Sequence, residues 1–243
     1  MRISIIVPVY NKWEETKACL DSLMKTKTDD DEVIVMDNGS NDDVAASLAF
    51  YSGIKGRHND ENLGFPKAVN QGVSLASGEY VCIMNNDIVV AGNWIDLLID
   101  HIEKGHADIV GPITNESSGK QARLVKIYRN YEELEITARE VAEVNQARFT
   151  EVGWLIGFLM VCPRTIFEKL GGFDERYKMG NWEDIDFCYS AKQAGYTLAI
   201  AEDVYVHHFG TASFKEDIIG YRKLLKDNQV LFEEKWGKVF YAQ

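Results

Sequence analysis

Amide and carboxylate side chains follow directly after a short apolar run in the first half of this 243-residue chain. The run is Tyr80–Met84, and Asn85, Asn86 and Asp87 come next. Five apolar residues with aromatic and β-branched types among them predict a buried strand rather than a helix. Ligands bind beyond the carboxyl ends of strands in open α/β sheets, so these polar side chains lie where a binding site is expected. Taken alone, such a tripeptide is more often a turn, because Asn and Asp favour turns.

Two earlier apolar runs also end in polar residues. Ile3–Val7 is followed by Pro8-Val9-Tyr10-Asn11, and the run that reaches Met36 is followed by Asp37-Asn38-Gly39-Ser40. A helical pattern over residues 13–24 separates them, and the order strand, helix, strand predicts a right-handed crossover and a parallel sheet. The side chains expected at the same sheet edge as Asp87 are Tyr10, Asn11 and Asp37.

A glycine turn at Gly64 leads into a predicted helix with Pro66 in its first turn, where proline is tolerated. The start of this helix could hold an anion, with Lys67 nearby. An ordinary loop and helix cap explains the same residues equally well.

A second helix, predicted to open near Asn181 and to run to about Ala194, carries an acidic residue on its apolar face. Helical spacing puts Asp184 on one stripe with Phe187, Cys188 and Ala191. A carboxylate on such a face is costly to bury and therefore needs a reason.

Composition limits the class of protein. With 46% hydrophobic and 26% charged residues, the chain fits one large α/β domain that can bury a full core. A net charge of −12 argues against a nucleic-acid polymer as partner, and a phosphate-bearing small molecule would need a bound cation. No stretch approaches eighteen apolar residues, so no transmembrane segment is expected. Four scattered cysteines with apolar neighbours indicate reduced thiols and a cytoplasmic location: Cys19, Cys82, Cys162 and Cys188.

The remaining pattern predicts further elements. Helices are expected over residues 42–50, 94–102, 132–146, 163–170 and 217–236, and strands over 54–59, 109–111, 198–200 and 204–206. Trp154–Cys162 is strongly apolar and broken by Gly157, which is typical of a bulge or a close approach to a ligand. The apolar stripe of the last helix indicates packing against the domain and leaves peripheral membrane contact as the weaker alternative.

The ordered motifs of residues 3 to about 213 resemble the inverting GT-A-fold glycosyltransferases of the large family two. The motifs are Pro8-Val9-Tyr10-Asn11, Asp37-Asn38-Gly39-Ser40, Asn62-Leu63-Gly64-Phe65, Asn85-Asn86-Asp87, Gly171-Gly172-Phe173-Asp174-Glu175, Trp182-Glu183-Asp184 and the segment at His207-His208. Each motif is weak alone, but seven in this order are specific. The resemblance implies a Rossmann-like, mostly parallel central sheet flanked by helices, with a C-terminal acceptor-side portion.

The resemblance also implies a nucleotide-sugar donor, most often a UDP-sugar in this family. Pro8, Tyr10 and Asp37 would hold the nucleoside. The other donor-binding residues implied are Asn11, Gly64, Lys67, Asn85 and Asn86.

A divalent metal, Mn²⁺ or Mg²⁺, is implied at the family's Asp-x-Asp motif. Here that motif reads Asn85-Asn86-Asp87, so Asp87 is left as the firm carboxylate ligand, and such a cation would neutralise the diphosphate leaving group. A histidine near the end of the family pattern often completes the metal site. The spacing His-x-Gly-x-x-Ser points to His208, with His207 as a close second.

Asp184 falls on the family's general base, which removes the proton from the acceptor hydroxyl. Its place at a helix N-terminus would favour the ionised form. Glu183 is the alternative base, although its helical neighbours favour a polar surface or a role in orienting a neighbour.

Two other functions compete with glycosyl transfer. A sugar nucleotidyltransferase would want a glycine-rich, basic loop after the first strand, where this chain has Pro8-Val9-Tyr10-Asn11. A non-catalytic sugar-nucleotide-binding module of the same fold is the second alternative. For the glycosyltransferase, saccharide, lipid-linked saccharide, protein and modified nucleobase acceptors stay open. One domain over 1–243 is expected, with a donor half (1–112), an insertion or lid (113–150), an acceptor and catalytic half (151–215) and a C-terminal helix (216–243).

Overall fold

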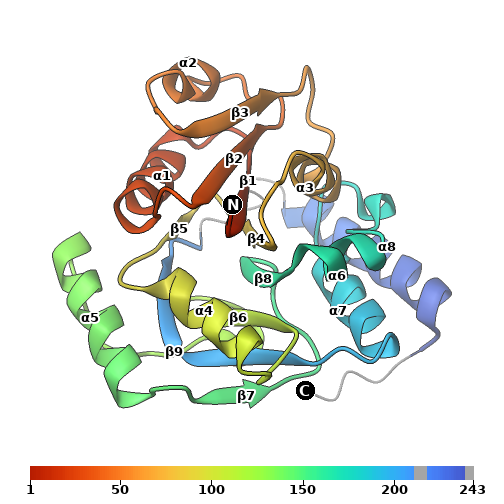
Figure 1. The fold of residues 1–243 in the computed structure, drawn as a ribbon. Helices are drawn as coiled ribbons and strands as arrows, with labels where there is room; N and C mark the ends of the chain where they lie inside the picture. Colours follow the sequence, from red (N-terminus) through yellow and green to blue (C-terminus); the bar gives the residue numbers. More distant parts are fainter. Residues whose placement is uncertain (211–217, 239–243) are drawn as a thin grey trace.

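A computed structural model describes residues 1–210 and 218–238 of the chain. Helices and strands alternate around one central sheet (Figure 1). The strands are β1 (Ile3–Val9), β2 (Asp31–Asp37), β3 (Ile54–His58), β4 (Tyr80–Met84), β5 (Ile88–Val89), β6 (Ile109–Thr114), β7 (Phe149–Glu151), β8 (Leu159–Pro163) and β9 (Leu198–His208). The helices are α1 (Trp13–Thr26), α2 (Val44–Leu48), α3 (Phe65–Ser74), α4 (Trp94–Glu103), α5 (Tyr131–Val144), α6 (Arg164–Lys169), α7 (Glu183–Gln193) and α8 (Ile218–Trp236), with short 3₁₀ turns at Gly119–Gln121 and Glu175–Tyr177.

The described residues form a nine-stranded sheet in the order β3-β2-β1-β4-β8-β6-β9-β5, with β7 paired to β9. The first four strands of that order are parallel, and β8 is antiparallel to both of its neighbours. Because β6 opposes β8 and β9 runs parallel to β6, the strands β1, β2, β3, β4, β6 and β9 all point the same way. The expected α/β fold with a mostly parallel, Rossmann-like sheet is confirmed.

Two hydrophobic clusters fill the two faces of the sheet. One joins alternate residues of β1 to α1 and α4 through Leu20 and Leu98, and the other joins the opposite face to α3, α6 and α7 through Val69, Phe167 and Phe187. Side chains alternate along a strand, so buried strands covered on both faces read as continuous apolar runs. This explains why the runs at β1, β2 and β4 stand out in the sequence.

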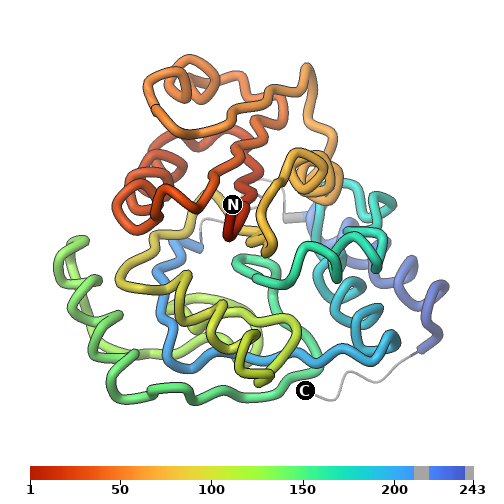
Figure 2. The backbone as a smooth tube through the Cα atoms, viewed as in Figure 1, coloured from red at the N-terminus to blue at the C-terminus, as the bar shows by residue number. Residues whose placement is uncertain are grey.

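The chain path in Figure 2 separates an upper portion, formed by the first part of the chain, from a lower portion formed after β4. In the lower portion α8 lies beside α7 (Figure 1), where Phe232 packs on Tyr189. No helix in the described ranges is both long and apolar enough to cross a membrane.

The structure differs from the predicted elements where strands are short or bulged. β5 and β7 have two and three residues and carry no periodic signal. The two strands expected at 198–200 and 204–206 are one strand, β9, whose pairing with β6 shifts register between Pro112 and Ile113. The apolar segment from Trp154 divides into a loop and β8. Of the residues expected in the histidine motif and the last helix, Thr211–Ser213 and Asp217 lie outside the described residues.

Candidate active site

A cavity of about 720 Å³ lies at the carboxyl ends of β1 and β4. It brings together residues from both halves of the chain, as expected for the edge of an open α/β sheet. Eight of the predicted site residues line it, namely Pro8, Tyr10, Asn85, Asn86, Asp87, Glu183, Asp184 and His208. Asn11, Asp37, Gly64, Lys67 and His207 do not line it.

Asp87 and His208 meet because β5 pairs with the end of β9. Ile88 lies opposite His208 in this antiparallel ladder, and the Phe209 N–H donates to the Asp87 carbonyl oxygen at 3.0 Å. His208 Nε2 lies 3.3 Å from Asp87 Oδ1, and His208 Nδ1 lies 2.8 Å from the Glu116 carbonyl oxygen. Burial alone would lower the pKa of His208, but the Asp87 carboxylate and Glu116 together outweigh it, and the pKa of His208 lies above its ordinary value.

The Asp87–His208 pair fits a divalent cation. Within the described residues, Asp87 Oδ1 is buried and accepts no hydrogen bond, although His208 Nε2 lies 3.3 Å away as its ion-pair partner. A charged oxygen without a hydrogen bond can bind a ligand. A carboxylate oxygen and an imidazole nitrogen are both ligands for Mn²⁺, whereas Mg²⁺ prefers oxygen. Within the described residues, no three His, Cys, Asp or Glu side chains gather where they could hold a metal ion. An ion here would take its remaining ligands from water or from a substrate diphosphate, as is common for Mg²⁺.

The two adjacent histidines point to opposite sides of β9. His207 Nδ1 lies 2.6 Å from the Tyr128 hydroxyl, and burial lowers the pKa of His207. Its register partner is Val89, not Asp87. The alternation of side chains along a strand therefore leaves only His208 in contact with Asp87.

The two amides before Asp87 have different environments. Asn86 Nδ2 donates to Thr16 Oγ1 at 2.8 Å, so this side chain ties the strand end to α1. The Asn85 backbone N–H donates to the Phe158 carbonyl oxygen at 2.8 Å, while the residue lines the cavity.

Asp37 lies behind the cavity wall. Its side chain is 1% exposed, Oδ2 lies 2.8 Å from His58 Nδ1, and Oδ1 accepts the Ser40 N–H at 3.0 Å. The neighbouring Asn38 does line the cavity and holds the loop that precedes α3, with Nδ2 2.9 Å from Asn62 Oδ1 and Oδ1 accepting the Leu63 N–H. Asp37 thus shapes this wall through its hydrogen bonds.

Three other predicted donor-binding residues shape the wall or lie away from it. Asn11 has a φ of 56° and its Oδ1 accepts the Asn41 N–H at 2.9 Å. Gly64 has a φ of 88°, and a Cβ there would lie 1.9 Å from the Lys178 carbonyl oxygen, so only glycine fits. Lys67 is exposed on the first turn of α3.

Asp184 lies in the first turn of α7 and is 9% exposed. Its Oδ2 accepts the Gly157 N–H at 2.8 Å, and its Oδ1 accepts the Ile185 N–H at 2.8 Å. Burial raises the pKa of Asp184, and these backbone donors oppose the shift without cancelling it. The helix N-terminus was expected to favour the ionised form, but desolvation outweighs it.

Glu183 is 5% exposed and lines the cavity, which corrects the expectation that it faces a polar surface. Its Oε2 is buried and has no hydrogen-bond partner in the part of the chain that the structure describes. Burial, together with the charge of Asp184, raises the pKa of Glu183 well above its ordinary value. Two adjacent buried carboxyls with raised pKa values are typical of a site of proton transfer.

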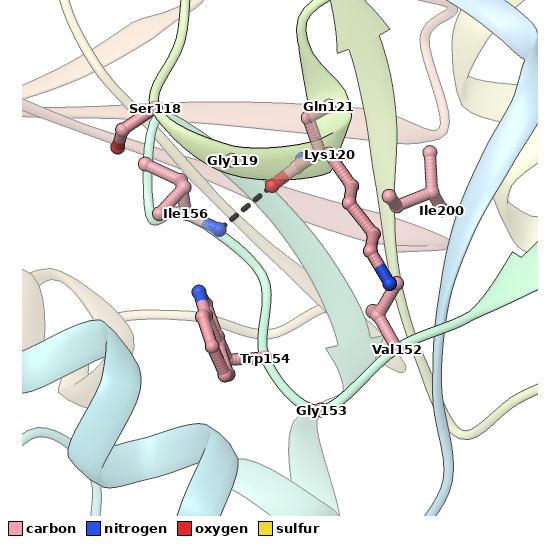
Figure 3. A pocket seen from close by; sticks show the side chains of 9 residues that line it. All are labelled: Ser118, Gly119, Lys120, Gln121, Val152, Gly153, Trp154, Ile156 and Ile200. Carbon is pink, nitrogen blue, oxygen red and sulfur yellow. Dashed lines mark hydrogen bonds between the residues drawn. The ribbon is translucent and has the colours of Figure 1, made fainter. Parts of the chain in front are cut away.

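A small pocket of about 10 Å³ adjoins the cavity and shares Ser118 and Ile156 with it. Figure 3 shows the Ile156 N–H donating to Gln121 Oε1, at 2.7 Å, with Trp154 below. This bond fixes the loop whose next residue, Gly157, donates to Asp184. Trp154 therefore lies at the edge of the site, while Trp182 packs on Phe232 of α8.

Several lining residues escaped the sequence-based prediction. Asn38, Asn62 and Phe65 fall inside motifs that were recognised, and their place beside Asp37 and Gly64 could have suggested them. Glu116 and Tyr221 come from segments without a local signal, because a loop and a distant helix reach the cavity only through the tertiary fold.

Comparison with known proteins gives one family. The model described as "Glycosyl transferase family 2" matches residues 4–171. The chain is 30% identical over 112 residues to glycosyltransferase GlyG of Streptococcus pneumoniae, which covers 44% of the chain and 37% of that protein. It is 26% identical over 215 residues to glycosyltransferase AglE of Haloferax volcanii, which covers 83% of the chain and 65% of that protein. The chain thus spans less than two thirds of the length of these relatives.

Solved structures share the fold. GalNAc-T7, solved with UDP, GalNAc and Mn²⁺, has a TM-score of 0.69 at 15% identity over 100% of this chain and 52% of that one. The mannosyltransferase PcManGT from Pyrobaculum calidifontis, solved with GDP-Man and Mn²⁺, has a TM-score of 0.68 at 19% identity over 100% and 66%. These likenesses confirm the GT-A fold.

Proposed function

The chain belongs to glycosyl transferase family 2, and from that premise we propose that it moves a sugar from a nucleoside diphosphate to an acceptor hydroxyl, with inversion at the anomeric carbon. The observation that carries the proposal is the arrangement of one cavity, in which the Asp87–His208 pair and the buried Asp184 both line the walls. The Asp87–His208 pair suits a cation that binds the diphosphate, and Asp184 suits removal of the acceptor proton.

The donor is proposed to be a UDP-sugar, held by Pro8 and Tyr10 at the end of β1, beside Asn38, Asn85 and the supporting Asp37. UDP and GDP-Man are bound in the two similar structures, which supports a nucleoside diphosphate of this kind. The resemblance to the family favours uridine.

A divalent cation, Mn²⁺ or Mg²⁺, is proposed at Asp87 and His208. When bound, it would stabilise the charge that develops on the leaving diphosphate. Of the described residues lining the cavity, Lys12 is the only Lys or Arg. The protein itself therefore offers little positive charge for a diphosphate, and this supports a role for a cation.

Asp184 is proposed to take the proton of the acceptor hydroxyl as the new glycosidic bond forms. The Gly157 and Ile185 N–H groups fix both of its oxygens, so the carboxylate is held in one orientation. A raised pKa makes it a stronger base than an ordinary aspartate once it is ionised. Glu183, next to it in the cavity, is the alternative base.

The acceptor is proposed to be a saccharide, a lipid-linked saccharide or a protein hydroxyl. Residues 1–112 would form the donor half, 113–150 a lid and 151–215 the acceptor half, and 216–243 would be the C-terminal portion that carries α8. The four cysteines are buried and unpaired, which supports a reducing compartment, the cytoplasm.

A panel of nucleotide sugars tests the proposal, with Mn²⁺, with Mg²⁺ and with EDTA. Thermal unfolding reports binding, because a ligand at a hundred times its dissociation constant stabilises the folded state by about 2.7 kcal/mol. Product analysis with simple saccharide acceptors reports transfer. We expect one donor to stabilise the protein only with a cation and to yield an inverted glycoside.

The other outcomes separate the competing functions. Donor binding without turnover against any acceptor would indicate a non-catalytic module. Release of pyrophosphate from a nucleoside triphosphate and a sugar phosphate would indicate a nucleotidyltransferase. Either result would contradict glycosyl transfer.

A further inference from the structure

The loop over residues 177–182 has an unusual backbone and leads directly into Glu183 and Asp184. Positive φ values occur at Lys178 (50°), Gly180 (106°), Asn181 (69°) and Trp182 (79°). Residues other than glycine rarely adopt such values and persist there only when their surroundings hold them. A strained loop before the candidate base therefore needs a restraint from elsewhere in the fold.

Asn228 of α8 supplies that restraint. The residue is only 5% exposed, and its Nδ2 lies 2.8 Å from the Asn181 carbonyl oxygen, 3.0 Å from that of Gly180 and 3.4 Å from that of Tyr177. One amide group thus donates its two hydrogens among three carbonyl groups of the loop. These carbonyls would be left without those donors if α8 moved away.

Further contacts fix the loop on both sides. On the α8 side, the Tyr221 hydroxyl donates to Asn181 Oδ1 at 3.1 Å. On the α3 side, the backbone of Lys178 lies so close to Gly64 that a Cβ there would overlap its carbonyl oxygen. The loop is therefore held between α3 and α8.

Helix α8 is also anchored to α7 at Asp186, two residues after the candidate base Asp184. Lys235 Nζ lies 2.7 Å from Asp186 Oδ2, and Trp236 Nε1 donates to Asp186 Oδ1 at 2.7 Å. Phe232 packs on the Trp182 and Tyr189 rings. Helix α8 therefore contacts the chain both before Asp184, in the loop, and after it, at Asp186, and these contacts fix the position of the first turn of α7.

From these contacts we infer that Asn228 is a positioning residue for the Asp184 carboxylate, acting through the 177–182 loop. The inference rests on the proposed function. The family model ends at residue 171, so the loop, Asp184 and α8 all lie beyond the matched region. Loss of the Asn228 donor lets the loop leave its left-handed conformation, which shifts the first turn of α7 and misplaces the base relative to the acceptor.

Two substitutions and one matched control test this role. Asn228→Ala removes the donor, and Asn228→Asp keeps the shape but turns a carboxylate oxygen toward the same carbonyls. Gln229→Ala removes an exposed amide from the next position of α8, where Gln229 bonds only to Glu233 within the described residues. We expect kcat to fall by roughly 10- to 100-fold in the Asn228 variants, since small misplacements cost about that much, and the donor KM to change little. Gln229→Ala should keep the wild-type kcat.

A pH profile and hydrogen exchange separate positioning from a purely structural role. We expect the acidic limb of the kcat profile to shift in Asn228→Ala, and amide exchange over residues 178–186 to become faster than in Gln229→Ala. Asn228 variants that fold with wild-type kcat, pH profile and exchange would overturn the inference. If they do not fold, Tyr221→Phe removes one bond to the loop, and an unchanged kcat and exchange in that variant would overturn it equally. A wild-type chain without transfer activity would contradict the proposed function, while exchange would still report on the loop.

Discussion

Glu32 lies on β2, within the parallel part of the sheet, whereas Glu183 lines the cavity. The two residues are almost equally buried, at 4% and 5% exposed. Glu32 accepts hydrogen bonds from the Ser4 hydroxyl, from the Ser77 N–H and hydroxyl, and from Lys55. Burial alone would raise the pKa of Glu32, but these donors, led by Lys55, lower it to about 2. Glu183 has no cationic partner in the described residues, and its pKa moves the other way.

The difference shows how burial and partners decide the role of a carboxylate. A buried charge is tolerated when every oxygen is satisfied, and it then stabilises the fold. Three buried side-chain oxygens have no hydrogen-bond partner in the described residues, and one of them is the Tyr131 hydroxyl of α5, away from the cavity. The other two, Asp87 Oδ1 and Glu183 Oε2, are carboxylate oxygens, and both belong to residues that line the cavity. Such oxygens are costly to the apo protein and are explained most simply by ligands that bind there.

Asp186 extends the comparison within a single helix. It lies two residues after Asp184 and is 2% exposed, but Tyr177, Lys235 and Trp236 satisfy its oxygens. Among the described residues, Asp184 accepts hydrogen bonds only from backbone N–H groups. Backbone donors orient a carboxylate without supplying a counter-charge, so the proton-accepting ability of Asp184 is kept.

The largest expected effect is that of Asp184→Asn on turnover. A positioned general base contributes roughly 100- to 10,000-fold in rate, so kcat should fall by about that factor. Donor binding should stay close to wild type, because Asp184 is proposed to act on the acceptor. Steady-state kinetics with calorimetric titration of the donor would check both, and wild-type turnover in this variant would remove Asp184 from the mechanism.

Glu32→Gln should affect stability and leave the site alone. The change removes the charge that pairs with Lys55 and turns an amide donor toward the serines, so the free energy of unfolding should fall by about 1–3 kcal/mol at neutral pH. The folded-state pKa of Glu32 is depressed, so its stabilising effect is present above the ordinary value of 4.5 and is lost as the pH falls toward about 2. The deficit of the variant should therefore shrink over that range in urea unfolding, while kcat per folded molecule stays constant.

Glu183→Gln should raise the free energy of unfolding, by less than Glu32→Gln lowers it. Because the pKa of Glu183 is raised in the folded state, the unfolded chain loses its proton first as the pH rises above 4.5, and wild-type stability falls. The glutamine variant has no such proton to lose, so its free energy of unfolding should exceed that of the wild type by an amount that grows with pH. The slope of this difference should correspond to at most one proton bound by the folded state and not by the unfolded state. Glu143→Gln, an exposed position on α5, is the matched control. Equal pH dependence in the two variants would show that the pKa of Glu183 is not raised.

The sequence predicted the fold and the site best where burial in the folded protein leaves a local pattern of apolar residues. The runs at β1, β2 and β4 are covered on both faces, so composition alone predicts them, and their polar ends identify Pro8, Tyr10 and Asp87. The helical stripe through Phe187 likewise predicts the burial of Asp184.

Long-range contacts could not be predicted in this way. The choice between His207 and His208 depends on the register of a two-residue strand, β5, that has no signal of its own. The partners of Asp37 depend on the neighbouring strand, and the sign of the Asp184 pKa shift depends on how deeply the cavity is buried. Asn228 and Tyr221 contact Asn181 of the loop from positions 47 and 40 residues further along the sequence. These features belong to packing between elements, which periodicity does not encode.

The most direct test of the central claim is a calorimetric titration of UDP and GDP into the wild-type protein and three variants, with Mn²⁺ or with EDTA. We predict that one nucleotide binds the wild type only with Mn²⁺, that Asp87→Ala abolishes this dependence together with tight binding, and that His208→Ala raises the Mn²⁺ requirement by at least about tenfold. His207→Ala should behave as wild type, since His207 contacts Tyr128 instead. Nucleotide binding that is unchanged by EDTA, or by Asp87→Ala in the presence of Mn²⁺, would contradict the assignment of the cavity as a metal-dependent donor site.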